Sequence, residues 1–200
     1  MIPAGYLLKR TAPPEGWTGP PQVIDVCSVS DCVNDTVVDL IAHWAYNGFG
    51  LATSPDVLHE LASASGIDLT GTRLFYYEIH EQEMETDGFT VPRGDWRPVS
   101  HGVPADETGL PVLPPQKAEC LGYDVVASET FLEHSPLSCN SVADSLPVNQ
   151  HCLFATLDAA RSAIETGAFK DCEPGTYKIV SVYLVDRTSE SAPPSNSDPS

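Results

Sequence analysis

Apolar and polar positions alternate along several short stretches of this chain, a pattern that predicts β-strands. Residues 72–80 (TRLFYYEIH) and 176–185 (TYKIVSVYLV) are also rich in aromatic and β-branched side chains, which favour extended backbone. In the first of these, Phe75, Tyr77 and Ile79 should share one face of the sheet, because successive side chains of a strand point to opposite sides. The strands predicted in this way are residues 22–30, 49–53, 72–80, 121–128, 151–155 and 176–185.

Apolar residues that recur three or four positions apart predict three helices. The first follows a capping residue at Asn34 or Asp35 and ends at Asn47-Gly48. The second begins at residues 54–56, with Pro55 in its first turn, and ends at Gly66. The third is capped by Thr156 and ends at Gly167. A single helical turn is also expected at residues 141–145, after a turn at residues 135–140 (SPLSCN).

Prolines and polar runs divide the chain into five segments. Five prolines and three glycines predict an irregular surface segment at residues 1–21. Repeated prolines make residues 81–119 an excursion between two more regular parts. The polar, proline-containing residues 187–200 predict a disordered tail. Two α+β halves remain, at residues 22–80 and 120–186.

The two halves resemble each other in sequence order. In the first half, Leu51-Ala52-Thr53 precedes Asp56, a helix and a Gly-Thr pair that opens a strand. In the second, Phe154-Ala155-Thr156 precedes Asp158, a helix and a second Gly-Thr pair. We therefore predict an α+β protein of two related strand-helix-strand halves, formed by a pseudo-twofold duplication, with a ligand cleft between them. Chance recurrence of common cap and stop residues is the alternative.

Four short segments resemble a family of uncharacterised bacterial proteins. They are residues 2–6 (IPAGY), 123–126 (YDVV), 135–140 (SPLSCN) and 149–154 (NQHCLF). The likeness extends to Glu173-Pro174-Gly175 and covers most of the chain outside the excursion and the tail. It implies a bacterial origin and no particular function.

The charge of the chain limits the kinds of partner that we expect it to bind. Asp and Glu number 28 against 10 Lys and Arg, a formal net charge of −18. Such a chain repels phosphate backbones and anionic membrane surfaces, so neither nucleic acid nor membrane is expected as a partner. A basic protein or a small ligand is expected instead. No signal peptide or membrane helix is visible, and six dispersed cysteines without a CxxC motif predict thiols in a cytoplasmic protein.

Residues 134–156 concentrate the side chains that carry chemistry. Cys139 and His151, with either Asn140 or Asn149, supply the thiol, imidazole and amide of a cysteine enzyme, although no known hydrolase signature surrounds them. The alternative is that Cys139 is a small buried residue and that Asn140 ties the turn through backbone hydrogen bonds. A zinc site from His134, Cys139, His151 and Cys152 does not fit the usual ligand spacing. We predict no metal and no cofactor.

These observations favour a protein that acts by binding, as inhibitor or immunity proteins do through charge complementarity. The alternative is an enzyme that acts on a small substrate through a Cys139/His151 pair. The sequence leaves the activity, the partner and the oligomeric state open.

Overall fold

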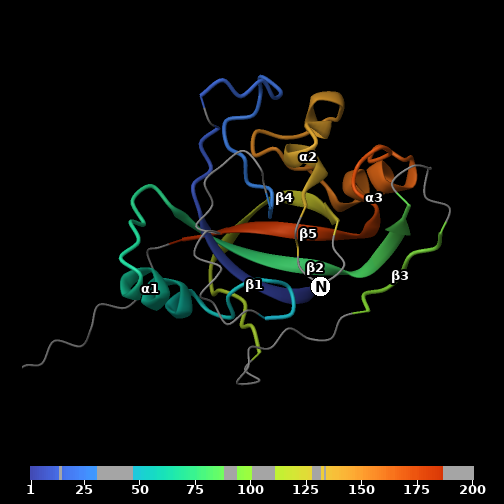
Figure 1. Ribbon diagram of the computed structural model, residues 1–200. Coiled ribbons are helices and arrows are strands. Elements are labelled where there is room, and N and C mark those ends of the chain that lie inside the picture. The colour runs from blue at the N-terminus through green and yellow to red at the C-terminus, as the bar shows by residue number, and fades with distance from the viewer. Residues whose placement is uncertain are drawn as a thin grey trace, which may run out of the picture.

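A computed structural model describes residues 1–13, 15–30, 47–87, 94–100, 111–127, 132 and 134–186. Its centre is an antiparallel sheet in which four long strands follow the order β1-β2-β5-β4, so that β2 and β5 are the inner pair (Figure 1). A short fifth strand, β3, pairs with the end of β2. The strands are β1 (Ile2–Lys9), β2 (Arg73–Thr86), β3 (Arg97–Pro98), β4 (Ala118–Ala127) and β5 (Gly175–Val185).

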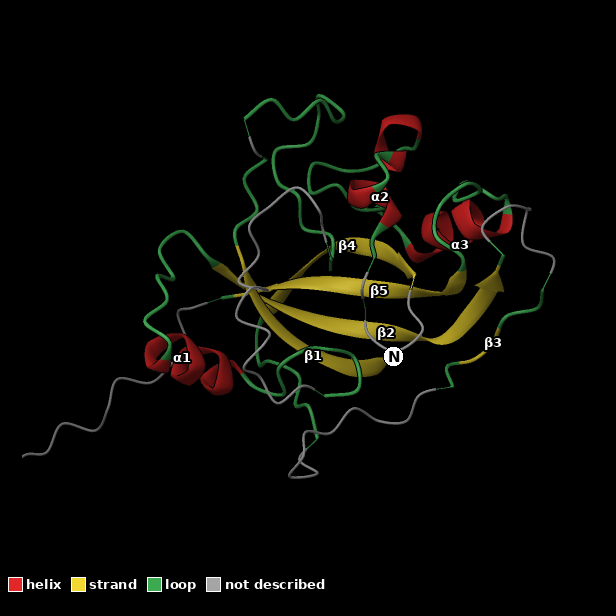
Figure 2. Cartoon of the chain, in the orientation of Figure 1, coloured by secondary structure: helices red, strands yellow, loops and turns green. Residues whose placement is uncertain are grey.

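The helices are short and flank the sheet. They are α1 (Pro55–Ala64), α2 (Pro136–Cys139) and α3 (Leu157–Glu165), with a 3-10 turn η2 (Val142–Ser145) after α2. Thr156 caps α3 through its side-chain oxygen, as predicted, and Ser54, where the second helix was expected to start, caps α1 in the same way. α1 and α3 lie at opposite ends of the sheet (Figure 2). The predicted first helix and the predicted tail fall outside the described residues.

Alternation along β5 assigns the two faces of the sheet. Val180 and Val182 pack with Phe75, Tyr77 and Ile79 of β2, which share one face as predicted. The opposite face carries Tyr76, Ile179 and Tyr183. There α1 buries Leu58 beside Tyr76, and α3 buries Ala160 and Ile164 in a cluster with Ile179. The fold is therefore α+β, with α1 and α3 on one face of an antiparallel sheet.

Three strand predictions and the prediction of an irregular N-terminal segment are wrong. Residues 2–9 are not irregular, since they form β1. Pro3 is tolerated there because β1 is an edge strand of the sheet, where a residue without an N–H group can be accommodated. Residues 22–30 are extended but form no strand, because their N–H groups bond the carbonyls of Thr11, Gln150 and His151 instead of a continuous ladder. The predicted strands at 49–53 and 151–155 contribute only isolated bridges, Tyr6↔Ala52 and Tyr123↔Phe154.

The two outer strands are bent in the same way. Gly5 of β1 and Gly122 of β4 lie at register shifts and have φ of 141° and 145°. A Cβ on Gly5 would lie 2.7 Å from the carbonyl oxygen of Ala52, and one on Gly122 would lie 2.6 Å from that of Phe154. Only glycine allows both this backbone angle and this close approach.

An asparagine fixes the loop that faces each bend. Asn47 accepts hydrogen bonds from the N–H groups of Phe49 and Leu51 and donates to the carbonyl of Ala4. Asn149 makes the matching set. Its side-chain oxygen accepts from the N–H groups of His151 and Leu153, and its amide donates to the carbonyl of Leu121. This geometry makes Leu51 equivalent to Leu153. The comparison of sequence order above paired Leu51 with Phe154, which is one position later.

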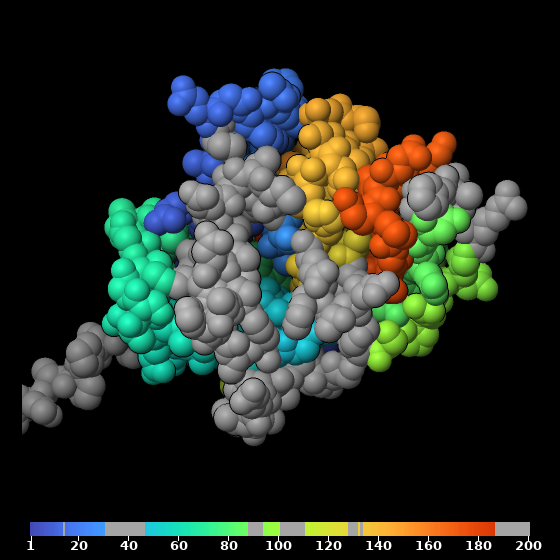
Figure 3. Space-filling model, viewed as in Figure 1, coloured from blue at the N-terminus to red at the C-terminus, as the bar shows by residue number. Residues whose placement is uncertain are grey.

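Each of these loops also receives a segment from the other half of the chain. The N–H of Cys27 donates to the carbonyl of His151 at 3.1 Å, and the N–H of Leu132 donates to the carbonyl of Phe49 at 3.3 Å. The first half therefore covers the Asn149 loop, while the second half covers the Asn47 loop. Figure 3 shows the chain around residues 15–23 (blue) beside the chain around residues 140–150 (golden yellow) at the top of the molecule.

Candidate functional site

The crossing of residues 22–30 over the Asn149 loop brings a carboxylate, a thiol and an imidazole together. Asp25, Cys27 and His151 each offer one atom, and these atoms all lie within 4.8 Å of one another. Backbone hydrogen bonds from Asp25 to Gln150 and from Cys27 to His151 hold the two segments side by side. Cys27 is fully buried, whereas the side chains of Asp25 and His151 are 21% and 14% exposed.

One side chain from β2 and one from the chain just after β1 orient the Asp25 carboxylate. Thr11 donates its hydroxyl to Oδ1 at 3.1 Å, and Arg73 Nη1 lies 3.1 Å from Oδ2 in an ion pair. His151 Nδ1 lies 3.5 Å from the same Oδ2. That contact lacks hydrogen-bond geometry, and Nδ1 is buried without a hydrogen-bond partner among the described residues. The imidazole therefore lies beside a thiol and a carboxylate, and its Nδ1 makes no hydrogen bond with the described residues.

This cluster has the residue types of a catalytic triad, but its thiol is not accessible to a substrate. A thiolate nucleophile must reach its substrate, and the Cys27 side chain has no exposed surface. The same three groups are ligands that Zn²⁺ accepts, because thiolate, imidazole and carboxylate all bind it. The arrangement is therefore better suited to holding a metal ion or a structural contact than to attacking a substrate.

The three residues proposed from sequence have different neighbours. Cys139 closes α2, and its sulfur lies 3.8 Å from the carbonyl oxygen of Ser30. Asn140 donates to Glu173 Oε1 at 3.2 Å. His151 lies with Asp25 and Cys27 instead. These three side chains therefore contact three different partners.

The exposed Asn140 joins a second polar cluster. His134 Nε2 lies 3.0 Å from Glu173 Oε1, the oxygen that Asn140 also contacts. Burial opposes ionisation of Glu173, but hydrogen bonds from its own backbone, from Asn140 and from His134 lower its carboxyl pKa below the ordinary value. This cluster anchors the turn at residues 134–140 to the chain before β5.

A buried network lies beneath these clusters. Asp124 of β4 is fully buried and accepts hydrogen bonds from the Ser135 hydroxyl at 2.6 Å and from the N–H of Val29 at 2.8 Å. Burial raises its pKa to about 6, although these hydrogen bonds act in the opposite direction. The buried Lys9 donates to the carbonyl of Ser28. The network thus ties residues 28–30 to β1, β4 and α2.

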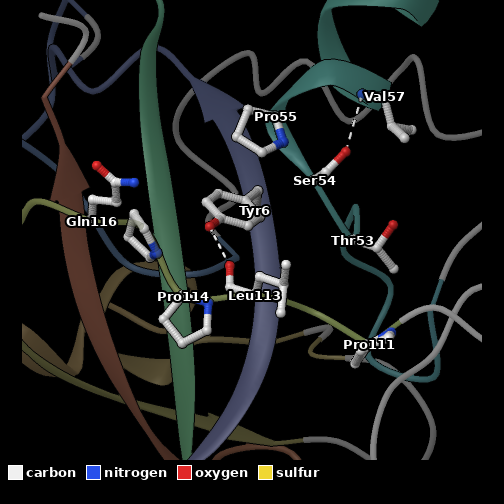
Figure 4. Close-up of a pocket in the computed structure, with 10 residues that line it drawn as sticks. Tyr6, Thr53, Ser54, Pro55, Val57, Pro111, Leu113, Pro114 and Gln116 are labelled. Atoms are coloured by element: carbon white, nitrogen blue, oxygen red, sulfur yellow. Dashed lines mark hydrogen bonds between the residues drawn. The ribbon is translucent and has the colours of Figure 1, made fainter. Parts of the chain in front are cut away.

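A groove opens where the start of α1 faces residues 111–116 (Figure 4). Its volume is about 490 Å³. The Tyr6 hydroxyl donates to the carbonyl of Leu113 at 2.6 Å and so joins the two walls. We refer to this feature as the Tyr6 groove. It is lined by Tyr6, Thr53, Ser54, Pro55, Val57, Pro111, Leu113, Pro114, Pro115 and Gln116.

Sequence reasoning missed both Asp25–Cys27 and the Tyr6 groove. Asp25 and Cys27 stand within an alternating apolar stretch, and nothing in that stretch indicates that it meets His151. A usable signal was present elsewhere. Asn47 and Asn149 each precede a leucine by four positions, and a Gly-Tyr pair occurs at Gly5 and at Gly122, so the paired loops could have been aligned.

Among the described residues, no helix has both the length and the apolar character needed to cross a bilayer. Comparisons with protein families, curated proteins and solved structures find no match to this chain.

Proposed function

We propose that this protein acts by binding a basic protein partner, with the Tyr6 groove at the centre of the contact. The observation that carries the proposal is an apolar groove on a chain with a large excess of negative charge. Interfaces of specific complexes commonly have an apolar centre and a polar rim. An inhibitor-like or immunity-like role would use the same chemistry.

Five of the eight Lys and Arg residues in the described part of the chain are buried or ion-paired, so they do not compensate the remaining surface carboxylates. Lys9 and Lys178 are buried. Arg73, Arg97 and Arg161 form ion pairs with Asp25, with Glu83 and Glu85, and with Glu165, respectively. The resulting negative field would attract a basic partner and accelerate its association.

Leu113 gives the groove an apolar contact point. It is 69% exposed, whereas most large apolar side chains of the described residues are buried. Exposed Asp56 in the first turn of α1 adjoins the groove residues Pro55 and Val57. A partner with an apolar side chain flanked by lysine or arginine would complement both features.

Affinity capture followed by measurement on the purified pair tests this proposal. Leu113→Asp should weaken binding of an identified basic partner at least about 10-fold, because it places a charge at the apolar centre. Ile24→Asp is the matched control, since Ile24 is also apolar and 61% exposed but lies outside the groove. Raising salt from about 0.05 to about 0.5 M should slow association. Equal binding by both variants at both salts would contradict the proposal.

The alternative proposal is a small-substrate enzyme in which Cys139 is the nucleophile, His151 the base and Asn140 the orienting group. The half-buried Cys139 supports it, but its sulfur contacts Ser30 and His151 contacts Asp25. Iodoacetamide labelling tests it. Fast labelling of Cys139 that slows on His151→Ala would support the enzyme, while slow labelling unchanged by that substitution would exclude it.

We also infer that the two halves descend from one duplicated unit, and we place the protein in the cytoplasm. The duplication is supported by the equivalent asparagines, Asn47 and Asn149, and by the equivalent glycines, Gly5 and Gly122. It is also supported by the way in which a segment of each half crosses the loop of the other half. The location is supported by cysteines that are not joined in disulfides among the described residues. A duplicated unit allows one copy to keep a structural pair of residues while the other acquires a new role.

A further inference from the structure

We propose that Asp25, Cys27 and His151 form a binding site for a single zinc ion. The proposal is independent of the Tyr6 groove and of the partner proposed above. It rests on the proximity of three ligand types, on the unused Nδ1 of His151 and on a comparison of the two halves.

The separations suit a tetrahedral ion. Metal–ligand lengths of about 2.0–2.3 Å place neighbouring nitrogen, oxygen and sulfur ligands roughly 3.4–3.6 Å apart. The distance between His151 Nδ1 and Asp25 Oδ2 is already 3.5 Å. The largest separation in the set is no more than 4.8 Å, so closing around an ion needs side-chain movement of about 1 Å. Three protein ligands leave a fourth position for water or an external ligand.

The groups around the ligands resemble the outer partners of a metal site. Thr11 holds the carboxylate through Oδ1, and Arg73 holds it through Oδ2. Metal-bound carboxylates and imidazoles are commonly oriented by such hydrogen bonds. His151 Nε2 lies 3.2 Å from the Gln150 side-chain amide, which can turn its oxygen toward an Nε2 proton when Nδ1 binds a metal. A thiolate and a carboxylate neutralise the ion, and Arg73 adds one positive charge outside them.

The equivalent place in the other half shows that the fold does not require these polar groups. There the loop carbonyl that receives the crossing segment belongs to Phe49, and the donating residue is Leu132. Both are apolar and buried. His151 takes the position of Phe49 in the second loop, and Cys27 takes the position of Leu132 in the segment that crosses that loop. An apolar residue serves the packing at the position of His151 in the other half, so packing alone does not account for a histidine there, whereas a ligand role does.

Cobalt binding to the purified full chain tests the site, because Co²⁺ occupies zinc sites and reports its ligands by absorption. We expect about one equivalent of Co²⁺ to give a thiolate-to-cobalt band and the visible bands of a four-coordinate ion, both removed by Zn²⁺. His151→Phe, which copies the residue of the other half and should therefore fold, should weaken binding more than about 100-fold. Cys27→Ala should abolish the thiolate band.

His134→Gln and Cys120→Ser are matched controls, since they remove a histidine and a cysteine outside the cluster. Both should bind Co²⁺ as the wild type does. Far-ultraviolet circular dichroism checks that each variant is folded. Absence of a thiolate band in the wild type, or a band that persists in Cys27→Ala, would overturn the proposal and leave Asp25 and His151 as a structural pair.

Discussion

Asn47 and Asn149 hold equivalent positions on the two sides of the molecule. Each side-chain oxygen accepts two backbone N–H groups of its own loop, and each side-chain amide donates to the carbonyl before a bent glycine. A loop and an outer strand are therefore joined by one side chain in each half. Packing of the Asn149 loop in turn sets the position of His151.

Removing the Asn47 side chain should destabilise the fold strongly. Asn47 is buried, so Asn47→Ala leaves two N–H groups and one carbonyl without partners and should cost about 3 kcal/mol in the free energy of unfolding. Asn149→Ala should cost less, about 1–2 kcal/mol, because Asn149 is only half-buried. Urea unfolding measures both. Asn140→Ala at an exposed position is the control and should change stability by no more than about 0.5 kcal/mol. An unchanged urea midpoint for Asn47→Ala would contradict this role.

Substitution of Gly5 or Gly122, the glycines at the two register shifts, should lower the stability of the fold. Gly122→Ala forces a positive φ on alanine and places its Cβ against the carbonyl of Phe154, so we expect a loss of at least about 2 kcal/mol. Gly5→Ala should behave alike. Gly48 has open space around it and no positive φ, so Gly48→Ala should be neutral or stabilise by up to about 1 kcal/mol. Thermal unfolding of the three variants provides the comparison, and similar melting temperatures would count against the two bends.

The buried Asp124 should make stability depend on pH in an unusual direction. Burial raises its pKa from 3.8 to about 6, so the folded state takes up a proton that the unfolded state does not bind until near pH 4. Its contribution to stability should therefore increase as the pH falls from about 7 to about 4, by up to about 3 kcal/mol. Other carboxylates, such as Glu173, act in the opposite direction because their pKa is lowered.

Comparison with Asp124→Asn isolates that contribution. The stability of the wild type relative to this variant should rise between pH 7.5 and pH 5, as the wild-type carboxyl becomes protonated. Urea unfolding at several pH values measures the difference. A difference that stays constant with pH would show that Asp124 does not titrate in this range.

The buried pair Glu83 and Lys178 should show strong coupling. The two residues face each other across β2 and β5, with Lys178 Nζ 3.4 Å from Glu83 Oε2. Burial lowers the Lys178 pKa, while Glu83 opposes that shift. Lys178→Met should cost about 3–5 kcal/mol because, among the described residues, it leaves Arg97 as the one cation paired with the buried Glu83 carboxylate.

The double variant Glu83→Gln/Lys178→Met should be more stable than Lys178→Met alone, because no uncompensated buried charge remains. Chemical unfolding of the single and double variants gives the coupling free energy. Additive losses in the double variant would show that the two charges do not interact.

The sequence by itself determined the elements that depend on local interactions. Helices α1 and α3 were predicted because a serine or threonine cap, an apolar stripe and a glycine stop lie within one short stretch. Strand β5 and the first part of β2 were predicted because aromatic and β-branched residues fill them. The prediction that residues 81–119 are all an excursion was wrong at residues 81–86, whose mostly polar side chains gave no strand signal although they continue β2. The face shared by Phe75, Tyr77 and Ile79 followed from alternation alone, since side chains of a strand alternate whatever surrounds it.

Only the tertiary structure decided where residues 22–30 bind and which side chains meet His151. An alternating pattern indicates an extended segment, but the partner of its N–H groups lies far away in sequence and has no local signature. The segment bonds the Asn149 loop instead of joining the sheet. For the same reason the thiol beside His151 belongs to Cys27 of the other half, whereas the nearer Cys139 in sequence contacts Ser30.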